Sequence, residues 1–144
     1  MNTKTILLID DEQNFLEPLT DALQYEGYKV LKARTGQEAL QILEKEKVDL
    51  VTIDIMLDPG KNLKEQTNSH ATGLFLCKEI RRKYPTVSAF CLSVISEIET
   101  IQKIESLGIK FIRKGETSLR KVLELLRSEL TGIAFSTDYL KKKE

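Results

Sequence analysis

Three acids and one lysine in this 144-residue chain each follow a short apolar run that is typical of a β-strand. The residues and the runs before them are Asp10 and Asp11 after 6–9, Asp54 after 48–53, and Lys114 after 111–113. If these runs are parallel strands of one sheet, their carboxyl ends meet at a single edge. Three carboxylates and an ammonium group would then share one crevice.

Such a crevice suits a divalent cation and a phosphoryl group. Carboxylate oxygens from neighbouring strands are the ligands that a hard cation such as Mg²⁺ prefers. Without a cation the acids repel one another, by on the order of 4 kcal/mol for two charges about 4 Å apart at an effective dielectric constant near 20. Lys114 can offset that repulsion, and it can also neutralise charge that builds up when a carboxylate attacks phosphorus.

The rest of the chain alternates between strand-like and helix-like patterns. Five runs have strand character, at residues 6–9, 28–33, 48–53, 87–92 and 110–113. Helical spacing of apolar residues follows each run: one helix contains Phe15 to Leu23, the others cover 37–47, a segment around Leu76 to Tyr84, 98–107, and a last segment that begins near Thr117.

Strict alternation of five strands and five helices predicts an α/β domain with a parallel sheet and helices on both faces. We expect a flavodoxin-like doubly wound sheet with the strand order 2-1-3-4-5. In this fold the ligand site lies where the strand order reverses, at the carboxyl ends of strands 1 and 3. Asp10, Asp11 and Asp54 occur at those two ends.

Composition limits the classes of protein to which the chain can belong. Hydrophobic residues make up 41% and charged residues 31%, which is ordinary for a soluble globular protein. The formal net charge is zero, so the overall charge favours neither a nucleic acid nor an anionic membrane as a partner. We expect no membrane segment, and we expect Cys77 and Cys91 to be reduced core thiols of a cytoplasmic protein.

The chain resembles the response-regulator receiver domains of bacterial two-component signalling over residues 4–129. The motifs that carry the resemblance are Ile6-Leu7-Leu8-Ile9-Asp10-Asp11-Glu12, Asp54-Ile55-Met56-Leu57 with Pro59 after it, Ser93, and Phe111-Ile112-Arg113-Lys114. Each motif alone is weak, but the combination is specific.

The resemblance implies a role for each motif residue. Asp54 would accept a phosphoryl group from a histidine kinase or a phosphotransfer protein. Asp10, Asp11, Asp54 and the Met56 backbone carbonyl would hold Mg²⁺, with Asp10 acting mainly through water. Ser93 and Lys114 would contact the phosphoryl oxygens, and Phe111 would be the switch aromatic.

The resemblance also implies an output. The surface of the fourth helix, fifth strand and fifth helix would change and control a downstream protein or effector domain, and it could form a homodimer. The domain would not be an enzyme acting on other substrates, and no direct contact with nucleic acid or membrane is expected.

The chain departs from the family pattern at three places. Gly115 stands where a proline, with a cis peptide bond before it, usually follows the lysine; we expect a trans bond and a different turn here. Val94 replaces a small residue, and we expect it to narrow access to Asp54. A polar insertion at 58–72 precedes the matching glycine, Gly73, and it is either a tolerated surface loop or a segment that selects partners.

Domain boundaries follow from these patterns. Residues 1–130 are predicted to form the receiver domain, and residues 131–144 a tail or the start of a linker. His70, the only histidine, lies within the insertion, where a solvated surface histidine is more common than a metal ligand.

Other interpretations remain open from the residues. Asp11 alone could cap the helix that contains Phe15, Ser93 could be an ordinary strand-end hydroxyl, and Phe111 a core aromatic. The whole chain could be a pseudo-receiver that binds partners without phosphorylation. A haloacid-dehalogenase-type phosphohydrolase is disfavoured. That class has a second acid two residues after its nucleophile, which here would be Glu12 after Asp10 or Gln13 after Asp11, and the usual threonine or valine context is missing.

Overall fold

The computed structural model of the chain describes residues 3–56, 72–94 and 97–132, in which strands and helices alternate. The strands are β1 (Thr5–Ile9), β2 (Lys29–Ala33), β3 (Leu50–Ile53), β4 (Ser88–Ser93) and β5 (Lys110–Arg113). The helices are α1 (Gln13–Tyr25), α2 (Gly36–Lys45), α3 (Thr72–Lys83), α4 (Ile98–Ser106) and α5 (Leu119–Thr131). The predicted insertion at 58–72 and the tail at 131–144 lie almost wholly outside the described residues.

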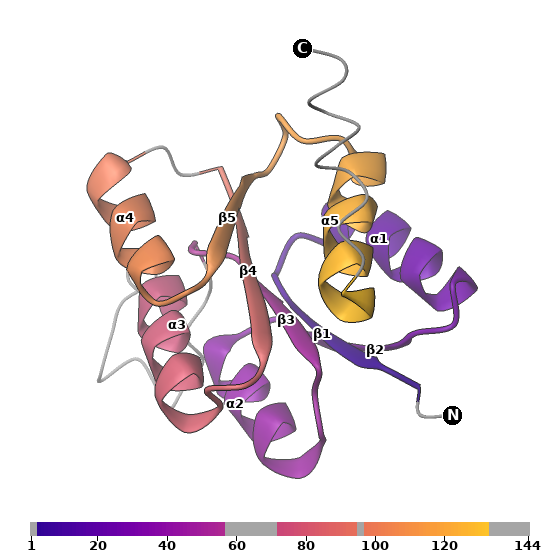
Figure 1. Cartoon of the computed structure of the whole chain (residues 1–144), viewed down its shortest axis with the longest axis horizontal. Coiled ribbons are helices and arrows are strands. Elements are labelled where there is room, and N and C mark those ends of the chain that lie inside the picture. Colours follow the sequence, from indigo (N-terminus) through magenta and orange to yellow (C-terminus); the bar gives the residue numbers. More distant parts are fainter. Residues whose placement is uncertain (1–2, 57–71, 95–96, 133–144) are drawn as a thin grey trace.

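The five strands form one parallel sheet in the order β2-β1-β3-β4-β5. Helices α1 and α5 cover one face, and α2, α3 and α4 cover the other (Figure 1). The predicted flavodoxin-like fold is therefore confirmed. The strand order reverses between β1 and β3, so a crevice at their carboxyl ends is the expected place for a site.

Strand β1 shows how the sequence builds two apolar layers. Its side chains alternate between the faces of the sheet, and all of them are buried. Ile6 and Leu8 belong to the core under α1 and α5, while Leu7 and Ile9 belong to the core under α2, α3 and α4. A central strand that is apolar on both faces is characteristic of a parallel sheet covered by helices.

Local side-chain chemistry sets where some helices begin. The Thr35 hydroxyl accepts a hydrogen bond from the Glu38 amide at 3.1 Å and so caps α2. The Ser118 hydroxyl accepts one from the Lys121 amide at 3.1 Å, so α5 begins at Leu119, close to the start near Thr117 that the apolar spacing predicted. The small difference arises because a capping residue sets the start of a helix, and the spacing of apolar residues does not reveal the cap.

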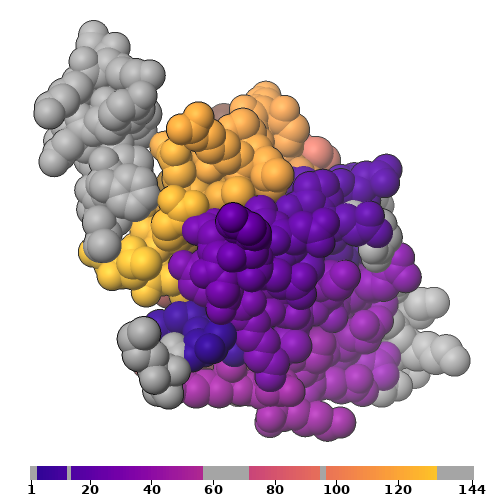
Figure 2. Space-filling view, turned by 90° about the vertical axis from the view of Figure 1, so that its right-hand side faces the viewer, coloured from indigo at the N-terminus to yellow at the C-terminus, as the bar shows by residue number. Residues whose placement is uncertain are grey.

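Helices α1 and α5 lie side by side on their face of the sheet (Figure 2). The Arg127 Nε atom lies 2.7 Å from Glu26 Oε1, so an ion pair joins the C-terminal ends of the two helices. This pair fixes the α1 end that is remote from the carboxyl edge of the sheet. None of the helices in the described part of the chain combines the length and apolar character that a bilayer crossing needs.

Candidate functional site

The carboxyl ends of β1, β3 and β5 each place one charged side chain at the same edge of the sheet. Asp10, Asp54 and Lys114 are the first residues after these strands. The backbone ladder continues through them: the Asp54 amide donates to the Ile9 carbonyl and the Lys114 amide to the Ser93 carbonyl, both at 3.0 Å. The sheet therefore fixes the backbone from which these charged side chains project.

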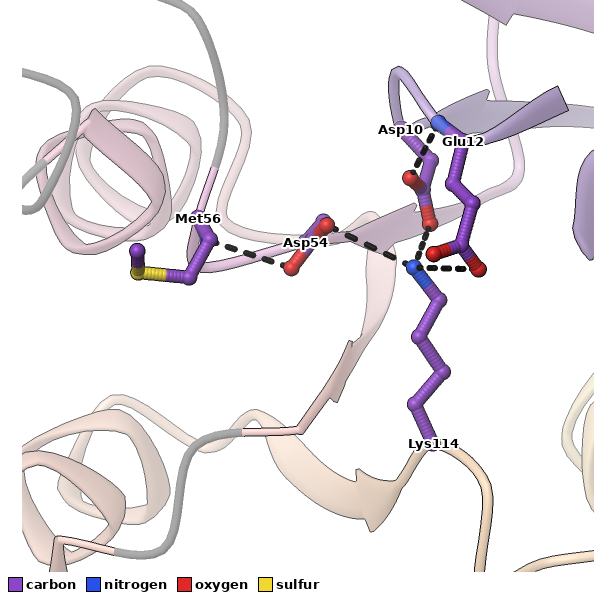
Figure 3. Close-up of polar contacts among 5 residues, drawn as sticks. All are labelled: Asp10, Glu12, Asp54, Met56 and Lys114. Carbon is purple, nitrogen blue, oxygen red and sulfur yellow. Dashed lines mark hydrogen bonds and ion pairs between the residues drawn. The ribbon is translucent and has the colours of Figure 1, made fainter.

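The Lys114 ammonium group lies among three carboxylates (Figure 3). Its Nζ atom is 2.6 Å from Asp10 Oδ2, 3.4 Å from Asp54 Oδ2 and 3.6 Å from Glu12 Oε1. The Lys114 side chain is only 7% exposed, and Asp10 and Asp54 are buried as well. These are charge-assisted contacts in a region of reduced solvent screening, where such interactions are strongest.

Backbone amides hold the other oxygens of the two buried carboxylates. The Glu12 amide donates to Asp10 Oδ1 at 2.9 Å, and the Met56 amide donates to Asp54 Oδ1 at 3.1 Å (Figure 3). Each carboxylate thus has one oxygen on a backbone amide and one on the lysine. Two contacts therefore orient each carboxylate.

The pKa values of the pocket reflect burial opposed by pairing. Burial raises the pKa of Asp10 to about 6, assisted by the charge of Asp54 and opposed by the hydrogen bonds from Lys114 and the Glu12 amide. Burial acts to lower the pKa of Lys114, but the hydrogen bond to Asp10 and the surrounding negative charge outweigh it and leave that pKa above its ordinary value. The lysine is therefore charged, while the negative charge on Asp10 is costly without a further cation.

Asp11 completes an acidic cluster at this edge. One carboxylate oxygen each from Asp10, Asp11 and Asp54 can be chosen so that all three lie within 4.8 Å of one another. An all-oxygen donor set of this size fits a hard divalent cation such as Mg²⁺. The alternative that Asp11 caps α1 is wrong, because Glu12 occupies the N-cap position and no side chain caps the helix.

The turn after Lys114 differs from one built around proline. Gly115 has φ +88°, whereas a proline ring fixes φ near −65°. No cis peptide bond occurs in the parts of the chain that the structure describes, so the expected trans bond before Gly115 is confirmed. The Thr117 amide closes the turn on the Arg113 carbonyl at 3.1 Å.

Comparison with known proteins decides the family. Residues 6–126 match the response regulator receiver domain. The chain belongs to the response regulator receiver domain family. Receiver domains are signalling domains rather than enzymes acting on other substrates; in general they interact with kinases and effector domains, and they typically bind a metal at the acidic pocket.

Solved receiver domains share the fold over nearly the whole chain. A CheY-like receiver domain protein from Methanospirillum hungatei is 24% identical, with 99% of this chain and 100% of that chain covered and a TM-score of 0.76. The receiver domain of an HD domain-containing protein from Pseudomonas fluorescens is 26% identical, with coverage of 91% and 97% and a TM-score of 0.76. A response regulator from Burkholderia pseudomallei, solved with a phosphorylated aspartic acid, calcium and citrate, is 21% identical, with coverage of 97% and 72% and a TM-score of 0.69.

The remaining motif residues of this receiver domain lie on β4, β5 and the segments after β3 and β4. Ser93 is the last residue of β4 and is fully buried, and Phe111 on β5 is half-buried opposite Cys91. Val94, by contrast, is 67% exposed, and the Met56 side chain is exposed too. The roles predicted for these residues depend on a phosphoryl group or a metal ion, so they remain predictions.

Two side chains that lie beside Lys114 were not predicted from the sequence to border it. Glu12 contributes a carboxylate at 3.6 Å, and the Phe15 ring centroid lies 4.8 Å from the Lys114 Nζ atom. Apolar spacing assigned Phe15 to the core-facing side of α1, which it shares with Leu16 and Leu19. Phe15 lies on the first turn of the helix that follows Asp10 and Asp11, and this position was the sequence feature that could have placed it beside the pocket.

Proposed function

We propose that the chain is a phosphorylation-controlled switch in which Asp54 is the phosphoacceptor. The observation that carries the proposal is a buried Asp54 carboxylate that accepts a hydrogen bond from the Met56 amide and lies 3.4 Å from the ammonium group of Lys114. A carboxylate held beside a cation at a sheet edge is suited to receive a negatively charged group. The receiver family and the phosphorylated aspartic acid of the Burkholderia pseudomallei relative support the same reaction.

The donor is a phosphohistidine of a sensor kinase or a phosphotransfer protein. An Asp54 carboxylate oxygen attacks phosphorus, a P–O bond forms, and the P–N bond to the donor imidazole breaks. The imidazole leaves with the electron pair and takes up a proton. Lys114 and Ser93 offset the negative charge on the transferred phosphoryl oxygens, and this is the largest contribution that residues of such a pocket make.

Asp10, Asp11, Asp54 and the Met56 backbone carbonyl are the groups that would hold Mg²⁺. The fit rests on the oxygen-only donor set and on the separations within 4.8 Å among the three acids. When bound, Mg²⁺ supplies positive charge opposite the phosphoryl oxygens.

The output is a change in the surface formed by α4, β5 and α5. Ser93 is the last residue of β4 and Phe111 lies on β5, so a movement of Ser93 toward the phosphoryl group acts on the strand that carries Phe111. Phosphorylation then shifts the population of two packings of this surface, with Phe111 as the side chain that turns inward. A downstream protein, an effector domain or a second copy of the chain would bind the shifted surface.

Labelling with acetyl phosphate tests the proposed function. We expect one phosphoryl group per chain in the presence of Mg²⁺, none in Asp54→Asn, and little after chelation of the metal. A chain that binds partners without phosphorylation would show no label under any condition. A phosphohydrolase would instead turn over a phosphomonoester steadily, and either result would contradict the proposal.

Val94 is proposed to set the rate of access to Asp54. It directly follows Ser93, and its β-branched side chain is 67% exposed at the pocket edge of β4. We expect Val94→Ala to increase the rate of labelling by acetyl phosphate and the rate of loss of the label. Equal rates in Val94→Ala and the wild type would remove Val94 from this role.

A further inference from the structure

Phe15 contributes an aromatic face to the lysine side of the pocket. Its ring centroid lies 4.8 Å from the Lys114 Nζ atom, within the range of a cation–π interaction. The Lys114 side chain is 7% exposed, so it has little contact with water. An aromatic face attracts a cation most strongly where water does not compete.

The ring differs from the two nearest carboxylates, those of Asp10 and Asp54, because it is not a candidate metal ligand. The oxygens nearest to Nζ belong to Asp10 and Asp54, which are also members of the acidic cluster. A divalent cation and a phosphoryl group on those acids would weaken their hold on the lysine. The quadrupole of the Phe15 ring is unaffected by a cation at the acids, so it can hold the ammonium group throughout.

The turn after Lys114 increases the need for such a contact. The Lys114 backbone is anchored by its amide to the Ser93 carbonyl, but the next residue is Gly115 with φ +88°. A glycine restricts the preceding residue less than a proline does. The direction of the long lysine side chain therefore depends more on what its ammonium group contacts.

We propose that Phe15 is a positioning residue that holds Lys114 at the pocket while the acids bind metal and Asp54 accepts a phosphoryl group. The proposal rests on the proposed function for its effect on phosphorylation. The contact itself does not depend on that function. The reacting atoms touch Lys114, and Phe15 acts only through it.

Two substitutions separate the aromatic face from simple packing. Phe15→Leu keeps an apolar side chain of similar reach but removes the ring, and Phe15→Tyr keeps the ring. With acetyl phosphate at saturating Mg²⁺, we expect Phe15→Leu to lower the initial rate of labelling by about fivefold to thirtyfold and Phe15→Tyr to stay within about twofold of wild type. The Mg²⁺ dissociation constant should be the same in all three proteins.

Carbon–proton NMR spectra of the lysine ε-methylene groups test the contact without phosphorylation. In the wild type the Lys114 ε-protons should be shifted upfield by the ring current, and in Phe15→Leu they should return toward the values of exposed lysines. This measurement on the wild type needs no variant to fold. If the chain cannot be phosphorylated, the proposed function fails while the NMR result still decides the contact.

Two results would overturn the positioning role. One is a wild-type rate of labelling in a folded Phe15→Leu protein. The other is a Lys114 spectrum that is unshifted in the wild type or identical in the wild type and Phe15→Leu, because any loss of rate would then not act through the lysine.

Discussion

At the scale of single residues, the carboxylates of the pocket carry more negative charge than its one lysine can offset. Asp10 and Asp54 are both buried, and each can place an oxygen within 4.8 Å of the other. At that separation their repulsion is on the order of 3 kcal/mol at an effective dielectric constant near 20. Lys114 contacts both, yet the pKa of Asp10 stays raised to about 6, with burial as the main cause. A further cation at the pocket would offset negative charge that Lys114 leaves uncompensated.

Magnesium should stabilise the fold through this acidic cluster. At a Mg²⁺ concentration ten times its dissociation constant, binding to the folded state adds about 1.4 kcal/mol to the free energy of unfolding. Urea unfolding with and without MgCl₂ measures this gain, which Asp11→Asn should reduce by weakening the site. Asp21→Asn is the matched control, because Asp21 is an exposed acid on α1 and should leave the gain unchanged. Equal gains in wild type and Asp11→Asn would exclude Asp11 as a ligand.

The sequence was most informative about the residues that follow strands. Asp10, Asp54 and Lys114 each follow an apolar run. Because the carboxyl ends of parallel strands meet at one edge of the sheet, the sequence predicted that these residues share that edge. The apolar spacing did not show that Phe15 lies against the lysine. Apolar spacing reports which face of a helix is buried, but not which side chain of that face borders a polar pocket.

At the scale of elements, the start of α3 is packed directly against the segment that carries Asp54. A Cβ atom added to Gly73 would lie 2.2 Å from Ile55 Cα and 2.6 Å from the Asp54 carbonyl oxygen. The Gly73 amide also donates to the Ile55 carbonyl at 3.2 Å. Because the obstructing atoms are backbone, a larger residue can be accommodated only if α3 or the Asp54 segment moves.

Gly73→Ala should therefore impair both stability and phosphorylation. We expect a loss of about 1–3 kcal/mol in the free energy of unfolding, together with slower labelling of Asp54. Gly108→Ala is the control, since its cost of about 1–2 kcal/mol arises from φ +76° in open space at the opposite edge of the sheet. Labelling rates that fall equally in both variants would show that lost stability, and not displacement of Asp54, is responsible.

The order and type of the elements could be predicted because apolar residues are spaced differently in helices and in strands. Element ends were less accurate: α5 begins where Ser118 caps it, which the spacing of its leucines could not show. The turn at Gly115 was foreseen only as different from a proline turn, and its φ required the structure.

At the scale of the whole molecule, the sheet separates two apolar cores, and both cysteines lie in the same one. Cys77 on α3 and Cys91 on β4 are fully buried in the core under α2, α3 and α4. Burial raises the pKa of the Cys77 thiol to about 12, and it raises the pKa of the Cys91 thiol as well. Both cysteines are free and buried, which confirms that they are core thiols, and their raised pKa values disfavour the reactive thiolate at neutral pH.

Thiol alkylation should consequently report opening of the whole fold. At pH 8 we expect both cysteines to resist iodoacetamide in the native protein and to react completely in denaturing urea. Mg²⁺ should slow the reaction at intermediate urea, because it stabilises the folded state. Rapid alkylation of either cysteine in the native protein would mean that the core under α2, α3 and α4 opens independently.

The central claim, that Asp54 accepts the phosphoryl group, is tested most directly by locating the label. Borohydride reduces an aspartyl phosphate to homoserine, and peptide mass spectrometry then identifies the residue that carried it. After treatment with acetyl phosphate and Mg²⁺, the account predicts homoserine at position 54 and unmodified Asp10 and Asp11. Homoserine at either of those positions, or at no position in a chain that retains its fold, would contradict it.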